Sequence, residues 1–256
     1  MVIEQRQISI TQKKSKEIRF YNTFKNNIRK RGIKLTQQPP HTFIFDVYGT
    51  LFDVDSVADK CNKYFPEKGE KISKTWREKQ LEYANLRQIM GNYEDFYSIT
   101  KDALHFAVKK YAEELNEEVE KELLENYLYL SPYPEAKAVL NQLGDKNLAV
   151  FSNGSHDMLD PLIKESILAD SFSKIISADE VQQFKPALDA YAYVSKILEV
   201  KPKDVLFMSS NGWDISGAKN YGFQTAWINR QNLPTEELKL EPDIIYKDLT
   251  GILEWK

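Results

Sequence analysis

The sequence has very little cysteine and histidine: one cysteine, Cys61, and three histidines among 256 residues. A single thiol cannot form an internal disulfide or a cysteine-based metal cluster, so the chain suits a reducing compartment. No stretch approaches the roughly 18 consecutive apolar residues of a membrane helix. With 42% hydrophobic and 29% charged residues, the composition is that of an ordinary globular protein. These absences exclude a disulfide scaffold and a membrane span.

Positive charge is also scarce over most of the chain. The net charge is -3, but residues 1–40 hold 10 of the 35 Lys and Arg residues and only 2 of the 38 acidic residues. The remaining 25 basic residues therefore face 36 acidic ones after residue 40. An acidic main body argues against nucleic acid as a partner.

Residues 1–40 are expected to form a basic N-terminal extension. They lack the apolar core of a secretory signal, while Ile18, Tyr21, Phe24 and Ile28 recur at helical spacing. Such a segment could dock on the body, lie on an anionic surface or serve as an organelle transit peptide. We expect a cytoplasmic protein, and organelle targeting stays open as the alternative. Two prolines at 39–40 mark the boundary with the main body.

After this boundary, short apolar runs alternate with helical patterns, which predicts an α/β fold. Most of the runs are apolar at consecutive positions, as in strands that are buried on both faces of a parallel sheet. The predicted strands are residues 42–47, 147–152, 173–177, 204–209, 224–229 and 243–246.

Residues 55–130 lack a convincing strand and carry three or four long helical patterns. We expect them to form a helical insertion placed straight after the first strand, between residues 41–54 and 131–256 of the α/β body. Later helices are expected to begin near Pro134 and Pro186. The helix after Ser155 is harder to delimit, because Pro161 would lie in the second turn of a helix beginning at His156. Asp160 is therefore an alternative start.

Polar residues stand where several predicted strands end. In an open parallel sheet, ligands bind at the carboxyl ends of the strands, so these residues are expected to meet in one crevice. The set comprises Asp46, Thr50, Ser152, Asn153, Lys185, Ser209, Asn211 and Asp214.

Five segments carry a resemblance to a known family. They read DVYGTLFDV (46–54), SNGS (152–155), FKPALDAY (184–191), SSNGWD (209–214) and WREKQLEY (76–83). In this order they resemble the L-2-haloacid dehalogenases of the haloacid dehalogenase superfamily, over roughly residues 41–250. The resemblance implies a Rossmann-like parallel-sheet core with an inserted helical cap. It also implies a cofactor-free homodimer that hydrolyses short L-2-haloalkanoic acids to D-2-hydroxy acids.

The resemblance assigns a role to each candidate residue. Asp46 would be the nucleophile that forms an ester with the substrate, because a halide leaves carbon without needing a proton. Arg77 and Asn153 would hold the departing halide. Thr50, Ser209 and Asn211 would orient Asp46, and Lys185 would favour its ionised form. Asp214 would be the base or the water-orienting group for ester hydrolysis, and Ser152 would bind the substrate carboxylate. Tyr48, Leu81, Phe96 and Trp213 would line the pocket, with plain core packing as the alternative for Phe96 and Trp213. Tyr191 is either core packing or a hydroxyl partner of Asp46.

Two other functions remain as alternatives. A magnesium-dependent phosphatase of the same superfamily would carry a second aspartate two residues after the nucleophile, where this chain has Tyr48. Phosphoryl transfer normally needs a metal ion, and the acids that would hold one are depleted here, so no metal site is expected. A non-catalytic binding protein is the other alternative. The complete set of polar residues at the predicted strand ends argues against it. Glu78 departs from the neutral glutamine of the family, and would repel a carboxylate substrate unless it points outward.

Overall fold

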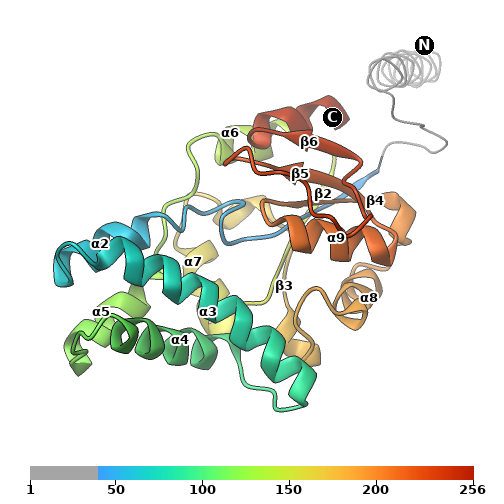
Figure 1. Cartoon of the computed structure of the whole chain (residues 1–256). Coiled ribbons are helices and arrows are strands. Elements are labelled where there is room, and N and C mark those ends of the chain that lie inside the picture. Colours follow the sequence, from blue (N-terminus) through green and yellow to red (C-terminus); the bar gives the residue numbers. More distant parts are fainter. Residues whose placement is uncertain (1–39) are drawn as a thin grey trace, which may run out of the picture.

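The computed structural model describes residues 40–256, and the predicted N-terminal extension lies outside them apart from Pro40. Six strands form one parallel sheet in the order β3-β2-β1-β4-β5-β6 (Figure 1). All six predicted strands are confirmed. Their bounds are β1 (Thr42–Phe45), β2 (Asn147–Ser152), β3 (Lys174–Ser177), β4 (Val205–Ser209), β5 (Gln224–Ile228) and β6 (Ile244–Tyr246).

Strand β1 lies at the centre of the sheet and is buried on both faces. Phe43 and Phe45 pack in one hydrophobic cluster together with α6 (Ala136–Gln142) and α7 (His156–Lys164). Ile44 packs in the opposite cluster together with α8 (Leu188–Ile197) and α9 (Gly212–Tyr221). Because side chains alternate across a strand, helices on both faces require the continuous apolar run that the sequence shows. The short 3-10 helices are Ala169–Ser171, Ala178–Val181, Pro202–Asp204 and Leu249–Trp255.

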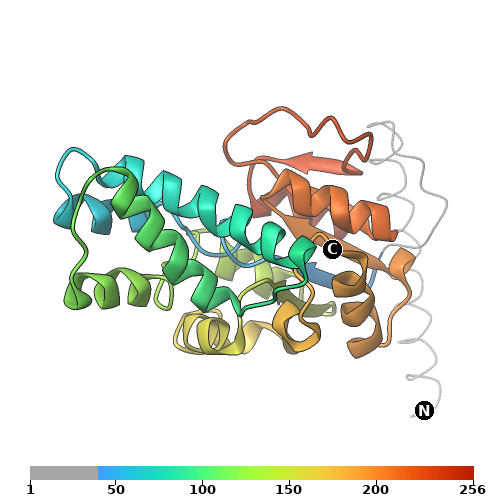
Figure 2. The same ribbon diagram turned by 60° about the horizontal axis from the view of Figure 1, so that its bottom comes forward.

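Four helices follow β1 and gather to one side of the sheet (Figures 1 and 2). We call them the cap helices: α2 (Ser56–Tyr64), α3 (Gly69–Met90), α4 (Phe96–Lys110) and α5 (Glu117–Asn126). The chain segments that enter and leave this group lie side by side, since Asp53 N donates to Ser131 O at 2.9 Å and Tyr133 N donates to Leu51 O at 2.9 Å. The cap helices are thus attached through a pair of adjacent linkers. The exact division at residues 54/55 and 130/131 stays a prediction.

The ends of the cap helices follow from local chemistry. Helix α3 stops at Gly91, whose left-handed backbone (φ 66°) lets its N–H reach the last carbonyl groups of the helix. Helix α4 starts after Asp95, whose side chain accepts from Ser98 N at 3.0 Å. Within residues 40–256, no helix has the length and apolar character needed to cross a bilayer.

The alternative start of α7 at Asp160 is wrong, because the helix begins at His156 and carries Pro161 in its interior. Proline has no N–H, so one turn of α7 lacks a backbone hydrogen bond. Four apolar side chains of the helix are nevertheless buried against the sheet, and their burial outweighs that loss. They are Met158, Leu159, Leu162 and Ile163.

Candidate active site

Asp46 lies at the carboxyl end of the central strand β1. Its backbone N–H continues the sheet by donating to Met208 O at 2.8 Å, and only 5% of the residue is exposed. The neighbouring strands β2 and β4 end beside it on Ser152 and Ser209. Parallel pairing therefore brings the polar strand ends to one edge of the sheet, as the sequence predicts.

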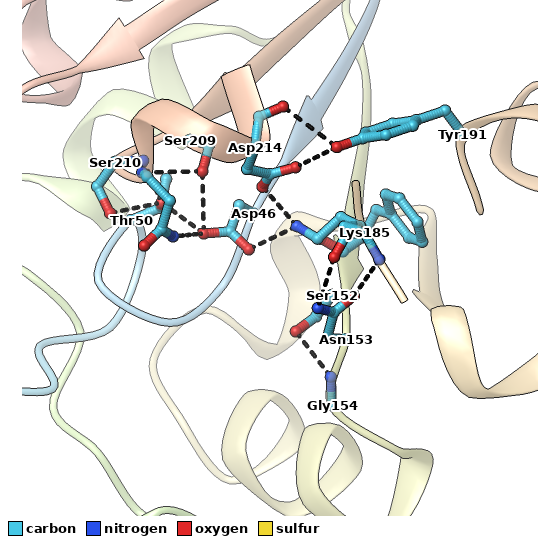
Figure 3. A network of polar contacts seen from close by, with 12 residues as sticks. Asp46, Thr50, Ser152, Asn153, Gly154, Lys185, Tyr191, Ser209, Ser210 and Asp214 are labelled. Atoms are coloured by element: carbon cyan, nitrogen blue, oxygen red, sulfur yellow. Dashed lines mark hydrogen bonds and ion pairs between the residues drawn. The ribbon is translucent and has the colours of Figure 1, made fainter. Parts of the chain in front are cut away.

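Four donors surround the Asp46 carboxylate. Lys185 Nζ donates to Oδ1 at 2.8 Å. Oδ2 accepts from Thr50 Oγ1 at 2.9 Å, Asn211 Nδ2 at 3.1 Å and Ser209 Oγ at 3.3 Å. Figure 3 shows this carboxylate between the hydroxyl groups on one side and the lysine on the other. An ionised carboxylate only accepts hydrogen bonds, so the four donors fix its orientation and suit its charge.

Lys185 joins two carboxylates in the buried core. Its Nζ lies 2.8 Å from Asp46 Oδ1 and 2.6 Å from Asp214 Oδ2, and it also donates to Phe151 O at 3.3 Å. Burial by itself would lower the pKa of Lys185, but the two carboxylates outweigh it and raise that pKa. Burial raises the pKa of Asp214, against the opposing effect of the Lys185 charge. The ammonium group thus stays charged between the two acids.

Tyr191 contacts Asp214 and not Asp46, so its expected role as a hydroxyl partner of Asp46 is wrong. Its hydroxyl donates to Asp214 Oδ1 at 2.7 Å (Figure 3), and its ring packs against Phe151 and Phe207. Burial, followed by the nearby carboxylate of Asp214, raises the pKa of Tyr191 and keeps its hydroxyl a donor. Tyr191 is therefore both core packing and a support for the second acid.

Ser152 and Asn153 lie close to Lys185. Asn153 Oδ1 accepts from Lys185 N at 2.8 Å and its Nδ2 donates to Lys185 O at 3.4 Å, so the amide holds the backbone of the lysine. Ser152 Oγ accepts from Gly154 N at 3.1 Å. This bond leaves the hydroxyl proton of Ser152 available to donate.

A small cavity opens above Asp46, between the sheet edge and the cap helices. Its volume of about 20 Å³ holds about one water molecule. Every predicted substrate-binding residue lines it, whereas Thr50, Tyr191, Ser209 and Asp214 support it from behind. The lining residues are Asp46, Tyr48, Arg77, Leu81, Phe96, Ser152, Asn153, Lys185, Asn211 and Trp213.

Tyr48 brings a polar group to the cavity at Asp46, whereas Glu78 does not line this cavity. The Tyr48 hydroxyl is buried and has no hydrogen-bond partner within residues 40–256, although it lines the cavity. Burial raises the pKa of Tyr48, so this hydroxyl is a protonated donor that can face a ligand. Glu78 is exposed and lines a larger outer cavity of about 580 Å³ next to the first one. Glu78 is therefore absent from the lining of the cavity at Asp46.

Arg77 reaches the cavity from α3 and is held by a residue that the sequence reasoning missed. Its Nη1 donates to Gln80 Oε1 at 2.6 Å. The signal for Gln80 was its position three residues after Arg77, on the same helix face.

Ser210 is a second residue that the sequence reasoning missed. Its backbone N–H donates to Thr50 Oγ1 at 2.8 Å and so directs the Thr50 proton to Asp46.

Comparisons with known proteins agree with this geometry. Residues 40–222 match the sequence model of the haloacid dehalogenase-like hydrolases. The (S)-2-haloacid dehalogenase of Xanthobacter autotrophicus is 46% identical over 73% of this chain and 74% of its own length. The (S)-2-haloacid dehalogenase 2 of Pseudomonas sp. (strain CBS-3) is 43% identical over 80% of this chain and 91% of its own length.

A solved structure is also similar over most of both chains. It is the L-2-haloacid dehalogenase from Xanthobacter autotrophicus with chloropropionic acid covalently bound. It is 39% identical to this chain, superposes with a TM-score of 0.79, and the match covers 84% of this chain and 97% of the other. From the shared sequence, sheet and cap, the chain belongs to the L-2-haloacid dehalogenases of the haloacid dehalogenase-like hydrolases.

Proposed function

We propose that the protein hydrolyses short L-2-haloalkanoic acids to D-2-hydroxy acids through an ester on Asp46. The observation that carries this proposal is the Asp46 carboxylate, which is held by four donors and opens into a cavity lined by Arg77 and apolar side chains. The covalently bound chloropropionic acid in the Xanthobacter relative is the kind of adduct that such a nucleophile forms.

In the first half-reaction, an Asp46 oxygen attacks the carbon that bears the halogen. Oδ2 accepts three hydrogen bonds whereas Oδ1 accepts one from Lys185, so Oδ1 has more free electron density for attack. A C–O bond forms on the face opposite the halogen, and the C–X bond breaks with its electron pair on the halide. Attack from the opposite side inverts the carbon, so an L-acid gives a D-product.

The halide departs toward Arg77 in this scheme. The guanidinium of Arg77 supplies a permanent positive charge, and Asn153 and the free Tyr48 hydroxyl add donors. Leu81, Phe96 and Trp213 keep water from the reacting carbon. Shielding from water strengthens each polar contact in the cavity.

The substrate carboxylate is proposed to bind at the start of α7. The Ser152 hydroxyl can donate there, together with the first backbone N–H groups of α7, which lack partners within the helix. A helix N-terminus also carries partial positive charge, which favours an anion.

In the second half-reaction, water opens the ester at the Asp46 carbonyl carbon. Asp214, which is fully buried and bound to Lys185 and Tyr191, is the proposed base or water-orienting group. The water oxygen stays on Asp46, the hydroxy acid leaves, and the carboxylate is restored.

The charges at the site support a reaction that needs no metal ion. The Lys185 ammonium stands between Asp46 and Asp214 at 2.8 and 2.6 Å and offsets part of the negative charge that would attract a divalent ion. Residues 40–256 also hold no group of three or more His, Cys, Asp or Glu side chains placed to bind a metal.

Three further expectations belong to the proposal. The cap helices are proposed to move when substrate enters, because the cavity at Asp46 lies between them and the sheet edge. A homodimer is expected from the family, and light scattering would test it. The cytoplasmic location also stays a prediction.

The test is halide release from each enantiomer of 2-chloropropanoate in excess chelator, beside phosphate release from an aryl phosphate with magnesium. We expect halide from the L-enantiomer alone, unaffected by chelator and abolished by Asp46→Asn. Phosphate release without halide release would refute the proposal and favour the phosphatase alternative.

A further inference from the structure

We propose that Gln80 and Thr100 are positioning residues that aim the Arg77 guanidinium at the departing halide while leaving its charge uncompensated. This inference rests on the proposed function, because it assigns the halide to Arg77. A series of hydrogen bonds runs from the cavity wall into the core of the cap helices and supports it.

The hydrogen bonds run in one direction along this chain. Arg77 Nη1 donates to Gln80 Oε1 at 2.6 Å, Gln80 Nε2 donates to Thr100 Oγ1 at 2.6 Å, and Thr100 Oγ1 donates to Phe96 O at 2.6 Å. Arginine only donates, so the Gln80 amide oxygen must face it, and the amide nitrogen must then face Thr100. Only one orientation of the Gln80 amide allows both of its hydrogen bonds.

Burial makes the arrangement rigid. Gln80 and Thr100 are both fully buried, and Trp76 Nε1 donates to Thr100 O at 2.7 Å, which ties α3 to α4 at the same level. Leaving a buried amide unpaired is costly, so Gln80 has little freedom to turn. The chain ends at the carbonyl of Phe96, whose ring lines the same cavity as Arg77. The hydrogen bonds therefore fix Arg77 on α3 and Phe96 on α4 relative to each other.

Gln80 is a neutral acceptor, and this sets what Arg77 can do. Within residues 40–256, no aspartate or glutamate forms an ion pair with Arg77. A carboxylate at position 80 would hold the guanidinium equally well but would cancel its charge. The amide fixes the direction of the side chain and leaves the full charge for a halide.

Three variants test the two parts of this idea. Gln80→Leu removes the acceptor at similar volume, and Thr100→Val removes the group that orients the amide. Gln80→Glu keeps an acceptor but adds a negative charge. The matched control is Thr75→Val, because Thr75 is also a buried threonine of the cap helices, with its hydroxyl 3.1 Å from Tyr111 OH and away from Arg77.

The readouts are bromide affinity by titration calorimetry and the kinetics of L-2-chloropropanoate turnover. We expect Gln80→Leu to weaken bromide binding and lower kcat by about tenfold with a smaller change in KM, since the halide charge develops in the transition state. Gln80→Glu should lose more bromide affinity and kcat than Gln80→Leu, because its carboxylate cancels the charge of Arg77. Thr100→Val should lose less, and Thr75→Val should retain both properties.

The outcomes separate this inference from the proposed function. If wild type binds bromide but releases no halide, the proposed function fails, and the variants are still judged by bromide binding. If Gln80→Leu binds bromide as wild type does, or Gln80→Glu binds it more tightly than Gln80→Leu, the inference is wrong. If wild type binds no bromide, Arg77 is not a halide site and the inference is overturned directly.

Discussion

The two sides of the cavity handle charge in opposite ways. On the sheet side, Lys185 is almost fully buried and lies within 2.8 Å of two carboxylates. On the cap side, Arg77 has a neutral amide as its partner. The first arrangement compensates charge inside the protein, whereas the second keeps a charge available. The sheet side therefore contributes both to stability and to the reaction, whereas the cap side contributes mainly to ligand binding.

Replacing Lys185 by Met breaks the sheet side of this comparison and should have the largest effect. It leaves Asp46 and Asp214 buried without a counter-charge, so we expect the free energy of unfolding to fall by about 3–5 kcal/mol. Turnover should be lost as well. Chemical denaturation and halide release would measure both. Adding Asp214→Asn should recover part of the stability, and a double variant as unstable as Lys185→Met alone would contradict the charge explanation.

Replacing Arg77 by Met breaks the cap side. We expect kcat to fall by a factor on the order of 10²–10³, because a donor to developing negative charge is removed. The free energy of unfolding should fall by about 1–3 kcal/mol, because the buried Gln80 Oε1 loses its donor while no ion pair of Arg77 is broken within residues 40–256. A loss of stability comparable to that of Lys185→Met would show that the two sides do not differ as described.

The sheet and its polar edge could be predicted from the sequence because each signal is local. Consecutive apolar residues mark a strand that is buried on both faces, and the polar residue after it lies at the ligand-binding edge. Asp46 and Ser152 follow this rule. Lys185 and Asp214 were identified by their motifs, and the structure brings both to Asp46.

The contacts that depend on how helices pack could not be predicted. A glutamine within a charged helix such as α3 is usually exposed, and only the packing of α4 against α3 buries Gln80 beside Thr100. Tyr191 reaches Asp214 because of how α8 lies beside α9, which no spacing in the sequence encodes. The start of α7 depended on tertiary burial outweighing a local proline signal.

A third group of charged side chains lies at the surface around His156, and its loss should have the smallest effect of the three. Burial lowers the pKa of His156, but hydrogen bonds to Asp160 and Glu180 outweigh it and raise that pKa. The stabilisation from a charged histidine is therefore full below its unfolded pKa of about 6.5 and lost as pH rises through the higher folded value. His156→Gln should lower the melting temperature by a few degrees at about pH 5.5 and hardly at all at about pH 9. His41→Gln is the control, since His41 is exposed and its side chain contacts no carboxylate within residues 40–256; an equal loss in both variants would refute the cluster's role.

The central place of β1 has a consequence for how the protein forms during synthesis. Thr42 pairs with Asn147 on one side and with Val205 on the other, so this apolar strand leaves the ribosome long before either partner exists. The cap helices, by contrast, make most of their contacts with one another and can form as soon as they emerge. Pairings between distant segments form slowly and leave apolar surface exposed in the meantime. The Asp46 carboxylate therefore gains its donors Lys185, Ser209 and Asn211 only late in synthesis. A chain that stalls before β4 would present an aggregation-prone strand to chaperones.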